Sequence, residues 1–162
     1  MSRSVLILLI LLVLWIIFGA WLCKTKLVDN NSNAANGPCD GEWSIEYKGQ
    51  NFDADGFISF PKSGDKHKAT SASINSMIDK TANYLKKNSS EKLTILGYFD
   101  EDESYGDKEL VYLGLARAND VKKMLTNKGV SASQLNVKPM QWETNCFNGN
   151  TLIRGAEFKF GK

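Results

Sequence analysis

The chain has 162 residues, 43% of them hydrophobic, and its 20 basic and 18 acidic residues leave a formal net charge of +2. This length holds about one ordinary domain. The intermixed charges form no basic face of the kind that binds nucleic acid, so we expect no nucleic-acid partner. No Gly-rich phosphate loop, nucleophile motif or set of metal ligands is visible, so we expect neither an enzyme nor a cofactor or metal.

The first residues predict a transmembrane helix. Residues 4–22 carry no charged side chain. As a helix this segment is about 28 Å long, which is close to the thickness of the hydrocarbon core of a bilayer. Residues 1–3 would then be a short N-terminus on one side of the membrane. Basic residues flank the span on both sides, so flanking charge does not settle its orientation.

Two alternatives for this segment stay open. A cleaved signal peptide needs small residues ahead of the cut, whereas bulky side chains stand in the candidate sites 18–20 and 20–22. A lipid anchor on Cys23 would need a small residue before it, and Leu22 stands there. We therefore expect a retained span.

The next segment predicts a tether that leads to one folded domain. Residues 23–41 are rich in Asn, Gly and Asp and have too little apolar content for a core. Fully extended, this segment reaches about 60 Å, enough to move a domain off the membrane surface. The folded domain is expected at 42–162.

Hydrophobic periodicity predicts strands and two helices within this domain. The expected strands lie at about 43–47, 57–60, 93–100, 135–137 and 156–160, and the expected helices at about 70–88 and 108–128. Gly129 follows the second helix as a typical C-terminal cap. Counted from the strand at 57–60, the order is βαβαββ, which indicates an α/β sandwich with both helices on one face of a mixed sheet.

One basic residue lies on the apolar side of the second helix. At 100° per residue from Leu110, Arg117 falls at about 340°, between Leu113 at about 300° and Val121 at about 20°. A guanidinium turned toward a core must be paired or directed into a cleft, because an unpaired buried charge costs several kcal/mol. The alternative is an arginine that snorkels at the sheet edge.

Asp100 ends the strand 93–100, directly before the loop to that helix. Carboxylate and guanidinium could therefore meet at one rim. Such a pair suits a zwitterion, with Asp100 for an ammonium and Arg117 as a fork for a carboxylate. A turn-forming or capping role for Asp100 is an equal alternative.

Several motifs resemble the OmpA-like peptidoglycan-binding domain over about residues 52–162. The segment Gly97-Tyr98-Phe99-Asp100 is similar to the family's Gly-[His/Tyr]-Thr-Asp. Residues 113–121 are similar to its Leu-Ser-x-x-Arg-Ala-x-x-Val, and residues 154–158 to its last strand. The resemblance implies that Asp100 and Arg117 clasp the diaminopimelate residue of the peptidoglycan stem peptide.

The sequence also departs from the family pattern. Phe99 replaces threonine, Gly114 replaces serine and Leu110 stands where asparagine is usual. The loop after Asp100 is longer and more acidic, and residues 139–143 replace a Gly-x-Gly-Glu element. These departures bear on affinity and ligand preference rather than on the fold.

The resemblance implies a bacterial inner-membrane protein with one span and its C-terminal domain in the periplasm. Its expected function is non-catalytic: the domain binds peptidoglycan and tethers the membrane, or a membrane complex, to the wall. The alternative is a subunit of a membrane complex that uses the domain for protein contact. Ion transport by this chain alone is not expected, because residues 4–22 include no acidic side chain.

An oxidising periplasm would allow a disulfide. The chain has three cysteines, of which Cys23 lies too near the membrane, so we expect a Cys39–Cys146 pair. The alternative is that both are unpaired thiols, because sequence alone does not give their separation.

Two weaker features lie outside the motifs. The loop after the strand 93–100 is acidic, through Asp100, Glu101, Asp102, Glu103 and Asp107. Its spacing fits no calcium loop, so a solvated acidic loop is expected. His67 is the sole histidine and lies in a Lys-rich segment. A surface position is therefore expected for it rather than a metal or catalytic role.

Overall fold

The computed structural model describes residue 39 and residues 41–143 and 146–161. The expected N-terminus at 1–3, the span at 4–22 and most of the tether at 23–41 lie outside the described residues. Within the described part, no helix is both long and apolar enough to cross a membrane.

The described residues form a mixed α/β fold whose helices lie within the predicted ranges. The elements, in chain order, are β1 (Glu42–Tyr47), β2 (Gln50–Asp55), β3 (Ile58–Pro61), α2 (Ala72–Lys87), β4 (Leu93–Phe99), α3 (Leu110–Asn127), the short 3-10 helix η1 (Ala132–Gln134), β5 (Leu135–Gln141), β6 (Phe147–Asn148) and β7 (Thr151–Phe160). The predicted fold class is confirmed, although strands β2 and β6 were not expected.

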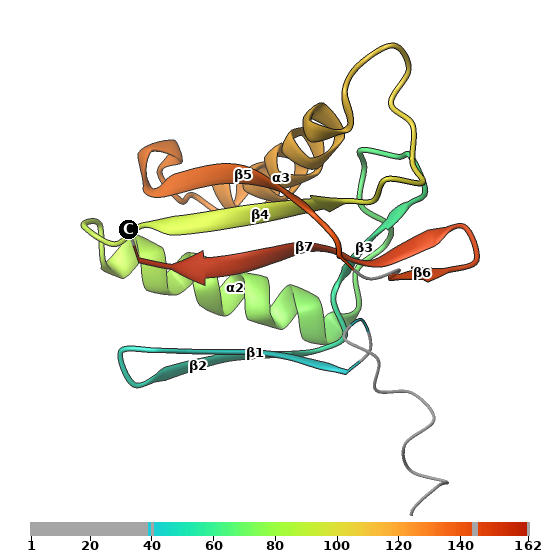
Figure 1. The fold of residues 1–162 in the computed structure, drawn as a ribbon. Coiled ribbons are helices and arrows are strands. Elements are labelled where there is room, and N and C mark those ends of the chain that lie inside the picture. Colours follow the sequence, from blue (N-terminus) through green and yellow to red (C-terminus); the bar gives the residue numbers. More distant parts are fainter. Residues whose placement is uncertain (1–38, 40, 144–145, 162) are drawn as a thin grey trace, which may run out of the picture. The chain divides into compact units, whose positions relative to one another are not determined.

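Strand β2 pairs with β1 in a separate antiparallel hairpin. Its sequence, QNFDAD, is mostly polar, and only Phe52 and Ala54 are buried. The two-residue turn is formed by Lys48 and Gly49, with φ of 49° and 72°. Positive φ at both turn residues is what a type I′ hairpin requires. The hairpin lies along α2 (Figure 1).

The main sheet is mixed, with strand order β3-β7-β4-β5 and the short β6 paired to β7. Strand β4 runs parallel to β5 and antiparallel to β7. The parallel pair is connected through α3, which packs on β4 and β5 (Figure 1). This βαβ unit places the C-terminal end of β4, which Asp100 follows, close to the part of α3 that carries Arg117.

One face of the sheet carries the main core. Side chains of β4 and β7, such as Leu93, Ile95 and Phe158, share a single buried cluster with Ile78 of α2 and Val121 of α3. Both helices therefore cover the same face, as predicted. Burying a side chain of this size contributes about 1.5 to 3 kcal/mol relative to leaving it exposed.

Helix α3 approaches β4 through two glycines. A Cβ on Gly97 would lie 2.0 Å from the carbonyl oxygen of Gly114 and 2.7 Å from the backbone nitrogen of Ala118. A Cβ on Gly114 would lie 2.7 Å from the carbonyl oxygen of Gly97. Glycine at position 114, where the family pattern has serine, is therefore what lets the helix lie this close to the strand.

The end of α3 confirms the predicted glycine cap. Gly129 has φ +87°, its N–H donates to Thr126 O, and Val130 N–H donates to Leu125 O. These two bonds form a Schellman motif, which satisfies carbonyls that the helix end leaves without a partner.

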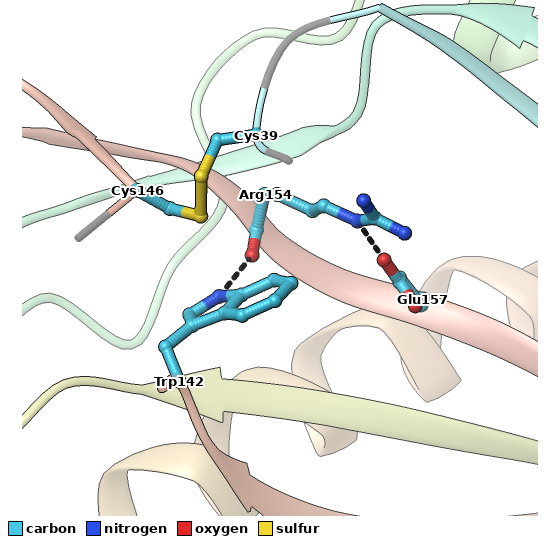
Figure 2. Close-up of a disulfide and its surroundings, with 5 residues drawn as sticks. All are labelled: Cys39, Trp142, Cys146, Arg154 and Glu157. Atoms are coloured by element: carbon cyan, nitrogen blue, oxygen red, sulfur yellow. Dashed lines mark hydrogen bonds and ion pairs between the residues drawn. A yellow bond between two sulfur atoms is a disulfide. The ribbon is translucent and has the colours of Figure 1, made fainter. Parts of the chain in front are cut away.

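A smaller cluster lies on the opposite face of the sheet and contains the disulfide. Cys39 and Cys146 are bonded, with 5.2 Å between their Cα atoms and a separation of 107 positions in the sequence. The predicted pairing is therefore present (Figure 2). Trp142 lies beside it, stacks on Tyr98 at 4.1 Å between ring centroids, and donates its indole N–H to Arg154 O. The disulfide thus joins the segment before β1 to the segment before β6.

Candidate functional site

Asp100 and Arg117 both lie near the C-terminal end of β4, as the sequence predicts. Asp100 is the residue after β4, and Arg117 comes from the middle of α3. Arg117 is 0% exposed, which confirms its place on the buried side of the helix. The alternative of an arginine that snorkels to the surface is wrong, because the whole side chain is enclosed.

The guanidinium of Arg117 is fully hydrogen-bonded within the protein. Its Nε donates to Gly64 O at 2.9 Å, Nη1 to Tyr98 O at 2.8 Å and Nη2 to Pro61 O at 3.1 Å. The remaining two N–H groups donate to the Glu103 carboxylate, at 2.8 Å to Oε2 and 2.7 Å to Oε1. A guanidinium has five N–H donors, so all of them are used.

Glu103 is equally well satisfied. Each of its carboxylate oxygens accepts one bond from Arg117 and one from a backbone N–H: Ser63 N donates to Oε1 at 2.7 Å and Asp100 N to Oε2 at 3.1 Å. Both side chains of the ion pair are 0% exposed. We call these four N–H groups, two from Arg117 and one each from Ser63 and Asp100, the carboxylate site.

Two loops bring these groups together. The loop 100–109 between β4 and α3 lies beside the segment 61–68, which begins at the last residue of β3 (Figure 1). Ser104 N donates to Ser63 Oγ at 2.9 Å, and the Tyr105 hydroxyl donates to Asp65 at 3.1 Å. Glu103 therefore reaches Arg117 from a loop that is itself held against a second loop.

Asp100 forms the turn that starts the loop. It is 7% exposed, and its Oδ1 accepts a bond from Asp102 N at 3.0 Å. Its carbonyl oxygen accepts from Glu103 N at 3.2 Å. The turn-forming role weighed for Asp100 is thus present, and its carboxylate is not among the partners of the Arg117 guanidinium.

The electrostatics favour an ionised Glu103. Burial by itself raises the pKa of the Glu103 carboxyl, but the hydrogen bonds and charge of Arg117 and the two backbone N–H groups outweigh it. The pKa of Glu103 therefore lies below its ordinary value. With Glu103 ionised, the opposite charges of Arg117 and Glu103 cancel within the buried pair.

The expectation of a solvated acidic loop is wrong for Asp100 and Glu103, which are both buried. Glu101, Asp102 and Asp107 are exposed, whereas Glu103 turns inward. Sequence reasoning missed this residue because a run of acidic side chains is usually a hydrated surface. The available signal was the buried arginine itself, which requires a carboxylate partner, combined with a loop more acidic than the family pattern.

A second ion cluster lies on the same helix. Asp120, with a side chain 9% exposed, accepts from the backbone N–H of His67 at 3.0 Å, pairs with the His67 ring at 2.6 Å and with Lys66 at 3.2 Å. Burial raises the pKa of Asp120, but the His67 and Lys66 contacts outweigh it and leave that pKa below its usual value. His67 is half-buried rather than free on the surface.

No group of three or more His, Cys, Asp or Glu side chains in the described ranges is arranged to hold a metal ion. The contacts of Lys66 and His67 with Asp120 hold the segment 61–68 against α3. That segment supplies Ser63, Gly64 and Pro61 to the carboxylate site and to Arg117, so the second cluster supports the first.

The solved structures similar to this chain share its fold. The peptidoglycan-associated lipoprotein from Burkholderia pseudomallei is 19% identical, with a TM-score of 0.50 over 64% of this chain and 88% of that one. The C-terminal domain of Helicobacter pylori MotB is 20% identical, with a TM-score of 0.50 over 67% and 86%. The OmpA-like domain of FopA1 from Francisella tularensis is 12% identical, with a TM-score of 0.50 over 76% and 86%.

At the level of sequence, the OmpA family matches residues 66–157, more than half of the 162-residue chain. The matched segment contains both predicted site residues, together with α2, β4, α3 and β5. The chain therefore belongs to the OmpA family.

Proposed function

We propose that the chain is a non-catalytic protein that binds the peptidoglycan stem peptide through its OmpA-like domain. The group bound would be diaminopimelate, with its ammonium facing Asp100 and its carboxylate facing Arg117. With residues 4–22 as a retained span, the protein would tether the bacterial inner membrane, or a complex within it, to the cell wall.

The observation that carries this proposal is that the carboxylate site already holds a carboxylate. Arg117 offers two parallel N–H groups, and Ser63 and Asp100 add backbone N–H groups, at distances from Glu103 of 2.7 to 3.1 Å. Two-pronged arginine contacts are among the strongest hydrogen bonds that proteins make to carboxylates. The same four groups suit the carboxylate of a peptide ligand.

The surroundings suit an ammonium beside that carboxylate. Asp100 accepts one bond at Oδ1 from the backbone N–H of Asp102, and the exposed carboxylate of Asp102 adds negative charge to the same turn. An acidic rim next to a paired arginine is complementary to a zwitterion, because it attracts the ammonium while the guanidinium takes the carboxylate.

Family membership and the disulfide support the cellular setting. One structure of similar fold is described as a peptidoglycan-associated lipoprotein. The Cys39–Cys146 disulfide fits an oxidising compartment such as the periplasm. A tether at 23–41 would then place the domain between membrane and wall.

Calorimetric titration of the full chain in mild detergent with a diaminopimelate tetrapeptide tests the proposal. Asp100→Asn keeps the side-chain shape but removes the charge that faces the ammonium, and Arg117→Lys keeps a charge but removes the fork. A loss of about 2 to 5 kcal/mol is expected for either, roughly 30-fold or more in affinity. The exposed Glu101→Gln is the matched control and should bind as the wild type does.

A second function is favoured by one specific observation. All five N–H donors of Arg117 are used internally, so the described state offers none of them to a ligand. This arrangement suits a subunit of a membrane complex that uses the domain for protein contact. Absence of tetrapeptide and sacculus binding by a folded wild-type chain would favour this function over the first.

A further inference from the structure

We propose that Glu103 is an internal occupant of the carboxylate site and competes with the carboxylate of the ligand. This inference rests on the proposed function, because it concerns access to the same site. Glu103 makes to Arg117 the two-pronged contact that a bound carboxylate would make, and it fills both backbone N–H positions as well. A ligand carboxylate therefore binds only when Glu103 leaves.

The site stays formed when Glu103 leaves. Arg117 keeps three bonds to backbone carbonyls, those of Gly64, Tyr98 and Pro61. These carbonyls hold the guanidinium in place, and its two freed N–H groups still point to where the carboxylate lay. Its position over the Phe60 ring, 5.3 Å from the centroid, is also independent of Glu103. A vacated site is therefore preorganised for an incoming carboxylate.

Release of Glu103 is a local change in one loop. The residue lies in the loop 100–109, whose flanking residues Glu101, Asp102 and Ser104 are exposed. Apart from its contacts with Arg117 and Ser63, Glu103 is held by the turn that begins at Asp100 and, on its C-terminal side, by the bonds of Ser104 and Tyr105 to the neighbouring loop. The change therefore involves the turn 100–103 and can leave the Tyr105 contact in place. Rotation of this turn would carry the carboxylate into water without changing β4 or α3.

Competition has a defined effect on affinity. We call the molecules in which Glu103 has left the carboxylate site the open state. If only a small fraction of the molecules is open, the apparent Kd of the ligand equals its intrinsic Kd divided by that fraction. A ligand must therefore supply a carboxylate equal to that of Glu103, and its preference over Glu103 comes from the contact between its ammonium and Asp100. Glu103 thus selects for zwitterionic groups against simple carboxylates.

The experiment uses the full chain in mild detergent with Glu103→Ala, which empties the site, and Glu101→Ala as the control in the same loop. Two probes are added: sodium acetate, with sodium chloride at equal ionic strength as reference, and the diaminopimelate tetrapeptide. Acetate should raise the Tm of Glu103→Ala, and leave the wild type and Glu101→Ala unchanged. The tetrapeptide should bind Glu103→Ala at least tenfold more tightly than the wild type.

The outcomes separate this inference from the proposed function. Equal tetrapeptide affinity for wild type and Glu103→Ala would overturn the inference and leave the proposed function standing. An acetate effect without any tetrapeptide binding would support the internal occupant and reject the stem peptide as ligand. A folded Glu103→Ala that responds to neither probe would reject the inference, and it would reject the proposed function as well if the wild type also binds no tetrapeptide.

A second variant covers the case in which Glu103→Ala does not fold. Glu103→Asp keeps the charge that neutralises Arg117, but its shorter side chain cannot reach all four donors from the same backbone position. Its tetrapeptide affinity should lie severalfold above that of the wild type. An affinity equal to or below that of the wild type, in a folded protein, would contradict the competition.

Discussion

Replacing Glu103 with glutamine should destabilise the domain far more than the same change at a neighbouring acidic residue. The Glu103 carboxylate accepts four hydrogen bonds, two at each oxygen. Glutamine has one oxygen, so its amide group would face two N–H donors without accepting from either. Arg117 would also remain as a buried charge without a countercharge. Breaking a buried pair in this way costs about 3 to 5 kcal/mol.

The pH dependence of the stability lost in Glu103→Gln shows whether the ionised Glu103 carboxylate is its source. A group whose pKa is lowered by folding contributes stability above its unfolded pKa, about 4.3 for glutamate, and loses it as the pH falls through the folded value. The pKa of Glu103 is lowered, so the wild type should lose this contribution below about pH 4.3. The difference in unfolding free energy between the wild type and Glu103→Gln should therefore become smaller as the pH falls. Asp120, whose pKa is also lowered, is present in both proteins and cancels in the difference.

Thermal unfolding of the full chain, followed by circular dichroism between pH 7 and pH 3, measures both effects. For a domain of this size the loss corresponds to a Tm lowered by about 10 to 20 °C at pH 7. Glu101→Gln changes the same chemistry at an exposed position and should stay within about 0.5 kcal/mol of the wild type. Equal Tm values for the two variants would show that the Glu103 contact does not persist in solution.

Two further predictions concern the frame of the site. Gly114→Ser should lower the free energy of unfolding by about 1 to 3 kcal/mol, because its Cβ would lie 2.7 Å from a carbonyl oxygen of β4. A denaturant unfolding curve equal to that of the wild type would contradict this close packing. Cys146→Ser should cost about 2 to 5 kcal/mol under oxidising conditions, and adding Cys39→Ser should cost little more, because one bond is lost in both cases. Denaturant unfolding with and without reductant measures the effect of the disulfide. A wild type whose unfolding free energy is the same in both conditions would contradict the prediction.

Much of the fold could be predicted from the sequence because its helices are strongly periodic. Helix α3 was found from its apolar arc and from Gly129, which caps it as expected. Strand β2 was missed because its pattern is mostly polar, with Phe52 and Ala54 as its two buried residues. Its pairing depends on a Lys48-Gly49 turn in which a lysine adopts positive φ, and turn rules do not expect lysine there.

The sequence predicts that Arg117 belongs to the site, but it does not predict which residue pairs with it. The helical pattern places Arg117 among apolar residues, and physical chemistry then requires a countercharge. The pattern does not say which carboxylate supplies it, because four acidic residues follow β4 in succession and differ only in how the loop turns. The Asx-type turn at Asp100 directs Glu103 inward and leaves Glu101 and Asp102 in solvent.

The buried pair links the stability of the domain to its affinity for a ligand. Each hydrogen bond that holds Glu103 on Arg117 stabilises the folded state and also lowers the fraction of molecules with an open carboxylate site. An opening free energy of about 2.7 kcal/mol would leave about 1% of molecules open and raise the apparent Kd about 100-fold. Substitutions of Glu103 should therefore lower stability and raise affinity together. A residue that only braces the site would lower both, so the sign of this correlation across Glu103→Asp, Glu103→Gln and Glu103→Ala distinguishes a competitor from a structural support.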